Sequence, residues 1–182
     1  MDDDRLGRRL DDWLPDPALR VAHRRRSTAS ASALWDAASA LELDESPVLG
    51  RLVRWRIPGL AGDLRFDRLF REPPFMVLDE LERGLVTGLV GRIWTLRRDY
   101  PQLAGPEEFR DWARAGTARV VIASWVAEDG SGAVLRAEAR VQALGTQGQL
   151  GVAAVRPLVR AFEQLIGTET LRAAVRRAER GG

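Results

Sequence analysis

The sequence predicts an α+β fold in which a curved antiparallel sheet wraps around a long C-terminal helix, with two short helices after the first strand. Three observations predict this fold. Residues 18–28, 75–94 and 117–144 carry the alternating or continuous apolar runs that are typical of strands. Residues 30–58 and 149–180 repeat apolar side chains at helical spacing. A twisted sheet that curls around one helix buries both apolar surfaces in a single core.

The composition excludes several kinds of chemistry. The 182 residues include no cysteine and one histidine, and all 28 basic residues are arginine. Disulfides, thiolate nucleophiles, zinc ribbons and two-histidine metal sites are therefore excluded, as are lysine-dependent phosphate loops and Schiff bases. We expect a protein whose function is mainly binding, with no metal and no cofactor.

Charge and hydropathy indicate where the protein is located and which partners it binds. The net charge is only +2, and acidic and basic side chains mix along residues 1–26, whereas a nucleic-acid-binding face gathers arginines without carboxylates. No apolar run approaches the roughly 18 residues of a membrane span. The start, Met1-Asp2-Asp3-Asp4, is too acidic for a secretory signal. We expect a soluble, cytoplasmic protein that binds no nucleic acid.

Residues 1–16 precede the main domain, which we place at residues 17–182. Four apolar residues in the first segment follow helical spacing: Leu6, Leu10, Trp13 and Leu14. Two interpretations stay open, a polar tail or a short amphipathic helix that docks on the domain or on a partner. Pro15 and Pro17 would end such a helix.

The main domain is expected to begin with a strand and two helices. His23 lies on the apolar face of the strand at residues 18–28, so we expect it at the core or at a sheet edge. The hydroxyl of Ser30 or Ser32 can cap a helix that runs to about residue 40. A second helix begins at Ser46-Pro47 and ends at a Pro-Gly pair.

Residues 75–82 and 85–94 predict a hairpin with Arg83-Gly84 as its turn. The resulting register puts Glu80 opposite Thr87. One face of the hairpin is then expected to carry Met76, Leu78, Glu80, Thr87, Leu89 and Gly91, and the other Asp79, Gly88 and Arg92. A change of one residue in the turn would alter this register.

The second strand of this hairpin contains two glycines, and a long connection follows it. Gly88 and Gly91 predict that a bulky side chain crosses their strand, with Trp94 or a neighbouring aromatic as the candidate. Residues 95–115 predict a long connection that contains a short helix beginning at Pro106.

The last predicted hairpin supplies the most regular strand pattern. Its second strand alternates Leu135, Ala137, Ala139 and Val141 with Arg136, Glu138, Arg140 and Gln142. We expect the first set to face the core and the second to face water. The two alanines in the middle of the inward face leave room for something to fit against them.

A single long helix is expected from residues 149 to 180. Its apolar stripe comprises Val155, Leu158, Val159, Phe162, Leu165 and Ile166. Gly167 weakens the middle of this helix, which can kink there with Thr168 as the cap of a second segment. Gly167 and Thr170 are small and would oppose the small side chains of the sheet, so we expect an apolar cavity between them for a few rings or a short acyl chain.

Three local motifs carry a resemblance to a known superfamily. They are Gly88-Leu89-Val90-Gly91-Arg92-Ile93-Trp94, Ala137-Glu138-Ala139-Arg140-Val141, and Trp35 on the first helix. With the element order over residues 18–180, they resemble an uncharacterised bacterial branch of the START-like helix-grip superfamily, SRPBCC. Where that branch has two threonines in the second motif, this chain has alanines. The resemblance implies binding of lipids, sterols, polyketides or other apolar molecules; some members are cyclases or aromatases.

The leading functional interpretation is a module that binds an apolar small molecule between the sheet and the C-terminal helix. The expected cavity lining is Met76, Leu78, Thr87, Leu89, Ile93, Leu135, Ala137, Ala139, Val141, Leu158, Phe162 and Ile166. The alternative is a polyketide cyclase-like or aromatase-like enzyme, although no catalytic motif can be transferred. Its candidate groups are Glu80 with Thr87, and Asp79 with Arg92. A protein that docks on the N-terminal helix and a second copy of the chain are further candidate partners.

Overall fold

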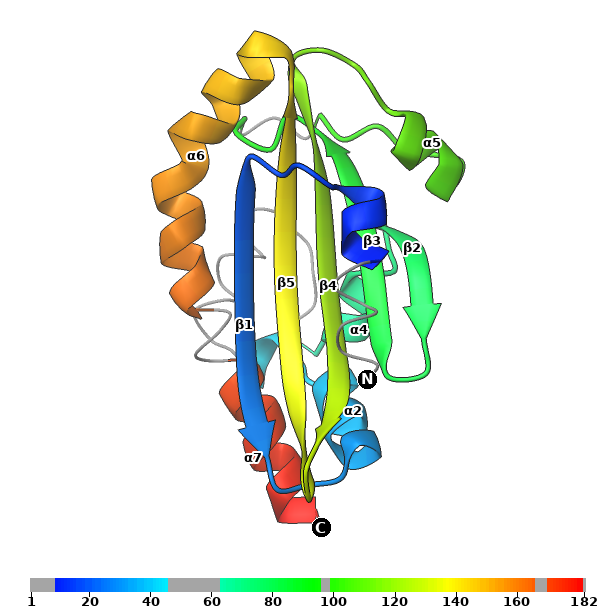
Figure 1. Ribbon diagram of the computed structural model, residues 1–182, viewed down its shortest axis with the longest axis vertical. Helices are drawn as coiled ribbons and strands as arrows, with labels where there is room; N and C mark the ends of the chain where they lie inside the picture. The colour runs from blue at the N-terminus through cyan, green and yellow to red at the C-terminus, as the bar shows by residue number, and fades with distance from the viewer. Residues whose placement is uncertain (1–8, 46–62, 96–98, 166–169, 182) are drawn as a thin grey trace.

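The protein has an α+β fold built on one five-stranded sheet (Figure 1). The computed structural model describes residues 9–45, 63–95, 99–165 and 170–181. Its elements are β1 (Leu19–Ser27), α2 (Ala31–Ser39), η1 (Leu43–Glu45), α4 (Phe66–Leu69), β2 (Met76–Leu81), β3 (Gly84–Gly91), α5 (Pro106–Asp111), β4 (Thr117–Asp129), β5 (Gly132–Leu144), α6 (Gly145–Leu165) and α7 (Leu171–Gly181). The strands lie in the order β1-β5-β4-β3-β2, and every neighbouring pair is antiparallel.

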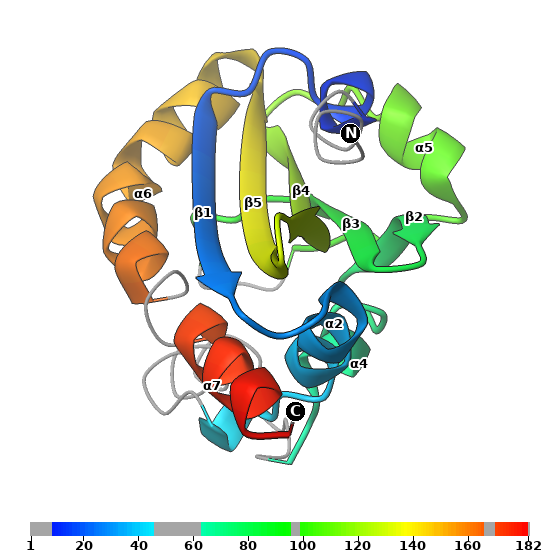
Figure 2. The same cartoon turned by 60° about the horizontal axis from the view of Figure 1, so that its bottom comes forward.

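The α+β class and the antiparallel sheet predicted from the sequence are confirmed. Helix α2 begins where a serine cap was expected, because the Ser30 hydroxyl accepts a hydrogen bond from the Ala33 backbone N–H. Instead of one long helix, the C-terminal region forms α6 and α7, which cover different parts of the sheet (Figures 1 and 2). The helix predicted from Ser46-Pro47 and the kink predicted at Gly167 lie outside the described residues.

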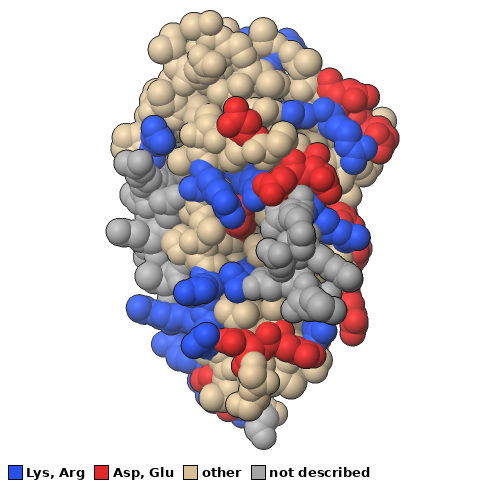
Figure 3. All heavy atoms as spheres, in the orientation of Figure 1, with Lys and Arg blue, Asp and Glu red and all other residues tan. Residues whose placement is uncertain are grey.

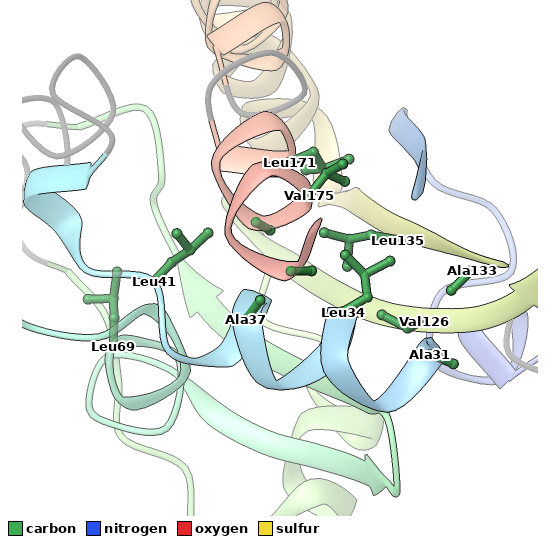
Figure 4. Packing of buried hydrophobic residues seen from close by; sticks show 12 residues of the cluster. Ala31, Leu34, Ala37, Leu41, Leu69, Val126, Ala133, Leu135, Leu171 and Val175 are labelled. Atoms are coloured by element: carbon green, nitrogen blue, oxygen red, sulfur yellow. The ribbon is translucent and has the colours of Figure 1, made fainter. Parts of the chain in front are cut away.

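Helices α6 and α7 cover one face of the sheet, which we call the inner face. This face carries Leu85, Thr87 and Leu89 of β3, Val120, Ile122 and Ser124 of β4, and Leu135, Ala137, Ala139 and Val141 of β5. Towards one end, Val152 of α6 packs with Leu19 and Val141. Towards the other end, α7 and α2 lie side by side, and Leu171 packs with Leu135 (Figures 2 and 4).

The opposite, outer face of the sheet is also buried, which corrects the prediction that alternate residues of β5 face water. Glu138 and Arg140 are only 5% and 2% exposed. A short helix at residues 9–13 lies over this face in Figure 1, and α5 adjoins it. The outer-face cluster comprises Leu10, Trp13, Leu14, Leu78, Val86, Val90, Phe109, Val121, Ala123 and Trp125. The alternation of β5 thus distinguishes two faces but does not reveal that both are covered.

The exposed rim of the outer face mixes charges of both signs. Figure 3, drawn in the same orientation, shows arginine and acidic side chains interspersed over this side of the molecule. Several of them form ion pairs across neighbouring segments, such as Arg26 with Asp129 at 2.6 Å and Arg9 with Asp79 at 2.8 Å. On this side, the arginines therefore do not form a patch of a single sign.

The β2–β3 hairpin differs from the predicted register. Leu81 pairs with Gly84, so the turn lies one residue earlier than expected. A bulge beside Leu78 then shifts the pairing of the rest of β2. Consequently, Met76 and Leu78 pack with the outer-face cluster, whereas Thr87 lies on the inner face.

An aromatic side chain does cross β3, but it is not Trp94. A methyl group added to Gly88 would lie 2.8 Å from the Phe109 ring and 2.8 Å from the Leu78 side chain. The Trp94 ring lies instead against Gly151 of α6. Gly88 is therefore needed for the close approach of α5 to the sheet.

Candidate ligand cavity

A partly open cavity of about 70 Å³ lies between the inner face and helices α2, α4 and α7. Its lining comprises Trp35, Ala38, Ser39, Leu41, Asp67, Phe70, Leu85, Thr87, Ile122, Ser124, Leu135, Ala137, Thr170, Leu171 and Ala174. Figure 4 shows Leu41, Leu135 and Leu171 around this end of the sheet. The cavity is therefore large enough to hold water-sized groups, and its open side connects it to the surface.

Small side chains on facing elements create this space. Ala38 of α2 and Ala174 of α7 oppose Ser124 and Ala137 of the sheet, and the bulkier Trp35 completes the wall on the α2 side. Longer side chains at these positions would fill the interface to ordinary packing density. The sequence of the three elements therefore maintains a gap where the core would otherwise close.

Hydrogen bonds within the protein already engage some of the polar groups in the lining. The Thr87 hydroxyl donates to the Ile122 carbonyl oxygen at 3.2 Å. The Asp67 carboxylate accepts a hydrogen bond from Arg65 through Oδ2 at 3.2 Å, and its Oδ1 lies 3.1 Å from Arg65 Nε. The remaining walls are mostly hydrocarbon.

Three residues predicted to line a cavity do line this one: Thr87, Leu135 and Ala137. The lining residues that the sequence did not single out for a cavity include Leu41, Phe70 and Ala174. Leu41 continues the apolar stripe of α2, so that stripe could have identified it as a lining residue. Phe70 follows a single helical turn, for which the sequence offers no comparable pattern.

The other predicted lining residues lie elsewhere. Leu89, Ile93 and Val141 pack in the cluster beneath α6, and Ala139 lies on the inner face opposite Ile122 and Val21. The shifted register places Met76 and Leu78 on the outer face. The side chains of Leu158, Phe162 and Ile166 lie outside the described part of the chain.

The first candidate acid–base pair does not form. Glu80 lies opposite Leu85 rather than Thr87. Arg71 donates hydrogen bonds to both carboxylate oxygens of Glu80, at 3.1 and 2.6 Å. These hydrogen bonds and the positive charge of Arg71 hold the pKa of Glu80 below its usual value. Glu80 is thus a solvated partner in a surface ion pair, not a general acid.

The second candidate pair is also separated. Asp79 accepts a hydrogen bond from Arg9 at 2.8 Å. Arg92 donates to the Gly116 carbonyl oxygen at 3.3 Å and lies 3.6 Å from Asp99. Both side chains therefore have structural partners, and the geometry provides no acid–base dyad at the predicted positions.

A buried ionic network joins the N-terminal segment to the outer face. Glu138 accepts hydrogen bonds from Arg20 at 2.8 and 3.1 Å and from Arg140 at 2.6 Å. Arg140 also donates to Asp11 at 2.5 Å and to the Leu14 carbonyl oxygen at 3.1 Å. The bond to Glu138 raises the pKa of Arg20. These contacts fasten the first segment of the chain, which makes the network structural.

Two further hollows share no lining residue with the cavity at the inner face. One, of about 230 Å³, lies at the start of β2 and is lined by Pro73, Pro74, Phe75, Met76, Gly88, Leu89, Val90, Pro101, Gln102 and Leu103. The other, of about 260 Å³, is an open polar depression at the β4–β5 turn. Among the described residues, no cluster of three potential metal ligands occurs, and no helix is both long and apolar enough to cross a membrane.

Comparison with solved structures yields several distant matches, among them the following two. No family model and no curated protein matches the sequence. The crystal structure of TTHA0849 from Thermus thermophilus matches with a TM-score of 0.34 and 9% identity, covering 90% of this chain and 99% of that one. CalU16 from Micromonospora echinospora matches with a TM-score of 0.29 and 16% identity, covering 88% and 84%. At these TM-scores, neither likeness carries an argument about fold family or function.

Proposed function

We propose that this chain binds an apolar small molecule in the cavity between the inner face and helices α2 and α7. The observation that carries the proposal is the set of small residues that keeps this part of the core open, with Ala38, Ala137 and Ala174 on three different elements. An apolar gap without an occupant forfeits dispersion contacts on all its walls. A ligand that fills it restores them.

The size of the cavity limits the ligand. Known small-molecule sites enclose about 300–1,000 Å³, whereas this cavity measures about 70 Å³. We therefore infer that a single ring or a short alkyl chain enters it, and that any larger part of the molecule extends through the open side. This range lies at the lower end of the size expected from the sequence.

The helix-grip architecture is part of the same proposal. It is supported by the antiparallel sheet, by α2 directly after β1, and by two C-terminal helices on the inner face. The site would then lie between the sheet and the C-terminal helices, as the resemblance implies. No described residue pair favours the enzymatic alternative.

The test is the binding of toluene to the purified chain, measured by ligand-observed NMR and by the shift in melting temperature. The parent protein is expected to bind toluene, and Ala137→Phe is expected to abolish binding because the ring fills the cavity. Overpacking can cost about 1–3 kcal/mol, so circular dichroism should verify that the variant is folded. Ala22→Phe is the matched control, since Ala22 is exposed on β1. Absence of binding to the parent, or equal binding to Ala137→Phe, would contradict the proposal.

A further inference from the structure

The outward side of the first half of α6 has an apolar, uncharged surface. It comprises four exposed residues whose spacing of i, i+3, i+4 and i+7 places them along one side of the helix: Leu150, Ala153, Ala154 and Pro157. We call these four residues the α6 stripe. Leu150 is 69% exposed and is the only exposed large hydrophobic side chain among the described residues.

The α6 stripe faces away from the sheet. On the other side of the same turns, Val152 packs with Leu19 and Val141 in the core. Gly151, next to Val152, lies against the Trp94 ring. Because successive residues of a helix are about 100° apart, the centre of the stripe lies roughly opposite this buried side. The stripe is therefore a solvent-facing surface and not a part of the core.

Helix α7 shows what an outward helix side carries elsewhere in this protein. Its exposed positions include Arg172, Arg176, Arg177 and Arg180. By contrast, residues 145–155 contain no charged residue, although charged residues make up 30% of the chain. Mainly uncharged atoms cover the upper end of the molecule in Figure 3, where Figure 1 shows the first turns of α6. An apolar stripe at helical spacing on a solvent-facing helix indicates that a partner covers it.

We propose that the α6 stripe is the contact surface between two copies of this chain, whose α6 helices pair antiparallel about a two-fold axis. Such an axis brings residues close to it near their own copies, so a charged residue there would face the same charge. The stripe meets this requirement because it carries no charge. With the axis between Ala153 and Ala154, each alanine lies opposite the other one in the second copy. Leu150 then lies opposite Pro157, and the small alanines let the helices approach to about 8 Å.

A lipid surface fits the α6 stripe less well than a second copy does. Helices that lie in a membrane surface combine a strongly basic side with several bulky apolar residues. In the first half of α6, Leu150 is the only bulky exposed residue and Arg156 the only charged one. The other exposed side chains beside the stripe are the neutral Thr146, Gln147 and Gln149. The described lining of the ligand cavity includes no residue of α6, so the role of the stripe is independent of the proposed ligand.

Sedimentation velocity of the full chain over a range of concentrations tests this proposal. The parent is expected to dimerise reversibly. Ala154→Glu is expected to weaken dimerisation about tenfold or more, because two carboxylates would then face each other near the axis. Ala104→Glu is the matched control, since Ala104 is exposed in the connection before α5, and it should dimerise like the parent. Circular dichroism verifies that both variants are folded.

A charge exchange tests the two-fold geometry. Ala154→Glu and Ala154→Arg are each expected to be mainly monomeric, whereas an equimolar mixture should form a mixed dimer. Failure of the mixture to pair would rule out the two-fold arrangement. A parent that stays monomeric would overturn the proposal, and its sedimentation with phosphatidylcholine–phosphatidylglycerol vesicles would assign the stripe to a lipid surface instead. A dimer that Ala154→Glu leaves unchanged would place the interface elsewhere and equally contradict the proposal.

Discussion

Arg140 lies on the outer face of β5, and its side chain is only 2% exposed. It bonds to Glu138 beneath it and to Asp11 and the Leu14 carbonyl oxygen above it. A buried charge is tolerated where it is paired and hydrogen-bonded, as Arg140 is with Glu138 and Asp11. The residue therefore connects the sheet to a segment of the chain that lies more than a hundred positions earlier in the sequence.

We predict that Arg140→Ala lowers the free energy of unfolding by about 3 kcal/mol, the lower end of the range for breaking a buried ion pair. The lower end applies because Arg20 still neutralises Glu138. Urea denaturation measures the change. Arg24→Ala is the control, because Arg24 is exposed on the neighbouring strand, and its effect should stay within about 0.5 kcal/mol. Equal effects of the two substitutions would show that the network does not stabilise the fold.

At the scale of elements, the contact between α5 and β3 depends on Gly88. A valine there would place its Cβ 2.8 Å from the Phe109 ring, so α5 must shift or the sheet must deform. We predict that Gly88→Val costs about 1–3 kcal/mol despite the strand preference of valine. The same substitution at Gly105 should cost less, because a Cβ added there would meet no atom within 4 Å. A urea melt in which Gly88→Val matches the parent would mean that the close approach has no energetic consequence.

Local patterns predicted the elements better than their pairing. The cap at Ser30 and the alternation along β5 involve residues close in sequence, and the division of β5 into two sets of side chains on opposite faces was correct. The β2–β3 register depends on which two residues form the turn and on a bulge beside Leu78, and neither has a distinctive signal in the chain. The displacement of Met76 and Leu78 from the inner face follows from that bulge.

At the scale of the whole molecule, both faces of the sheet are covered by segments that are remote in sequence. The polar alternation of β5 indicated water on one side because it could not show that residues 9–14 return to that side. Of the small residues expected beside a gap, Ala137 and Thr170 line the cavity and Ala139 does not. The extent of the gap depends on how α2, α4 and α7 meet, which no local pattern specifies.

The central claim is that the inner-face cavity is a binding site, and a crystal structure of the chain soaked with toluene tests it most directly. We predict one ordered toluene in the space bounded by Trp35, Ala137 and Leu171, with the sheet unchanged. The hollow at the start of β2 serves as an internal comparison, since it is larger and lies outside the proposed site. Toluene found only in that hollow, or a tightly closed interface around Ala137, would contradict the account.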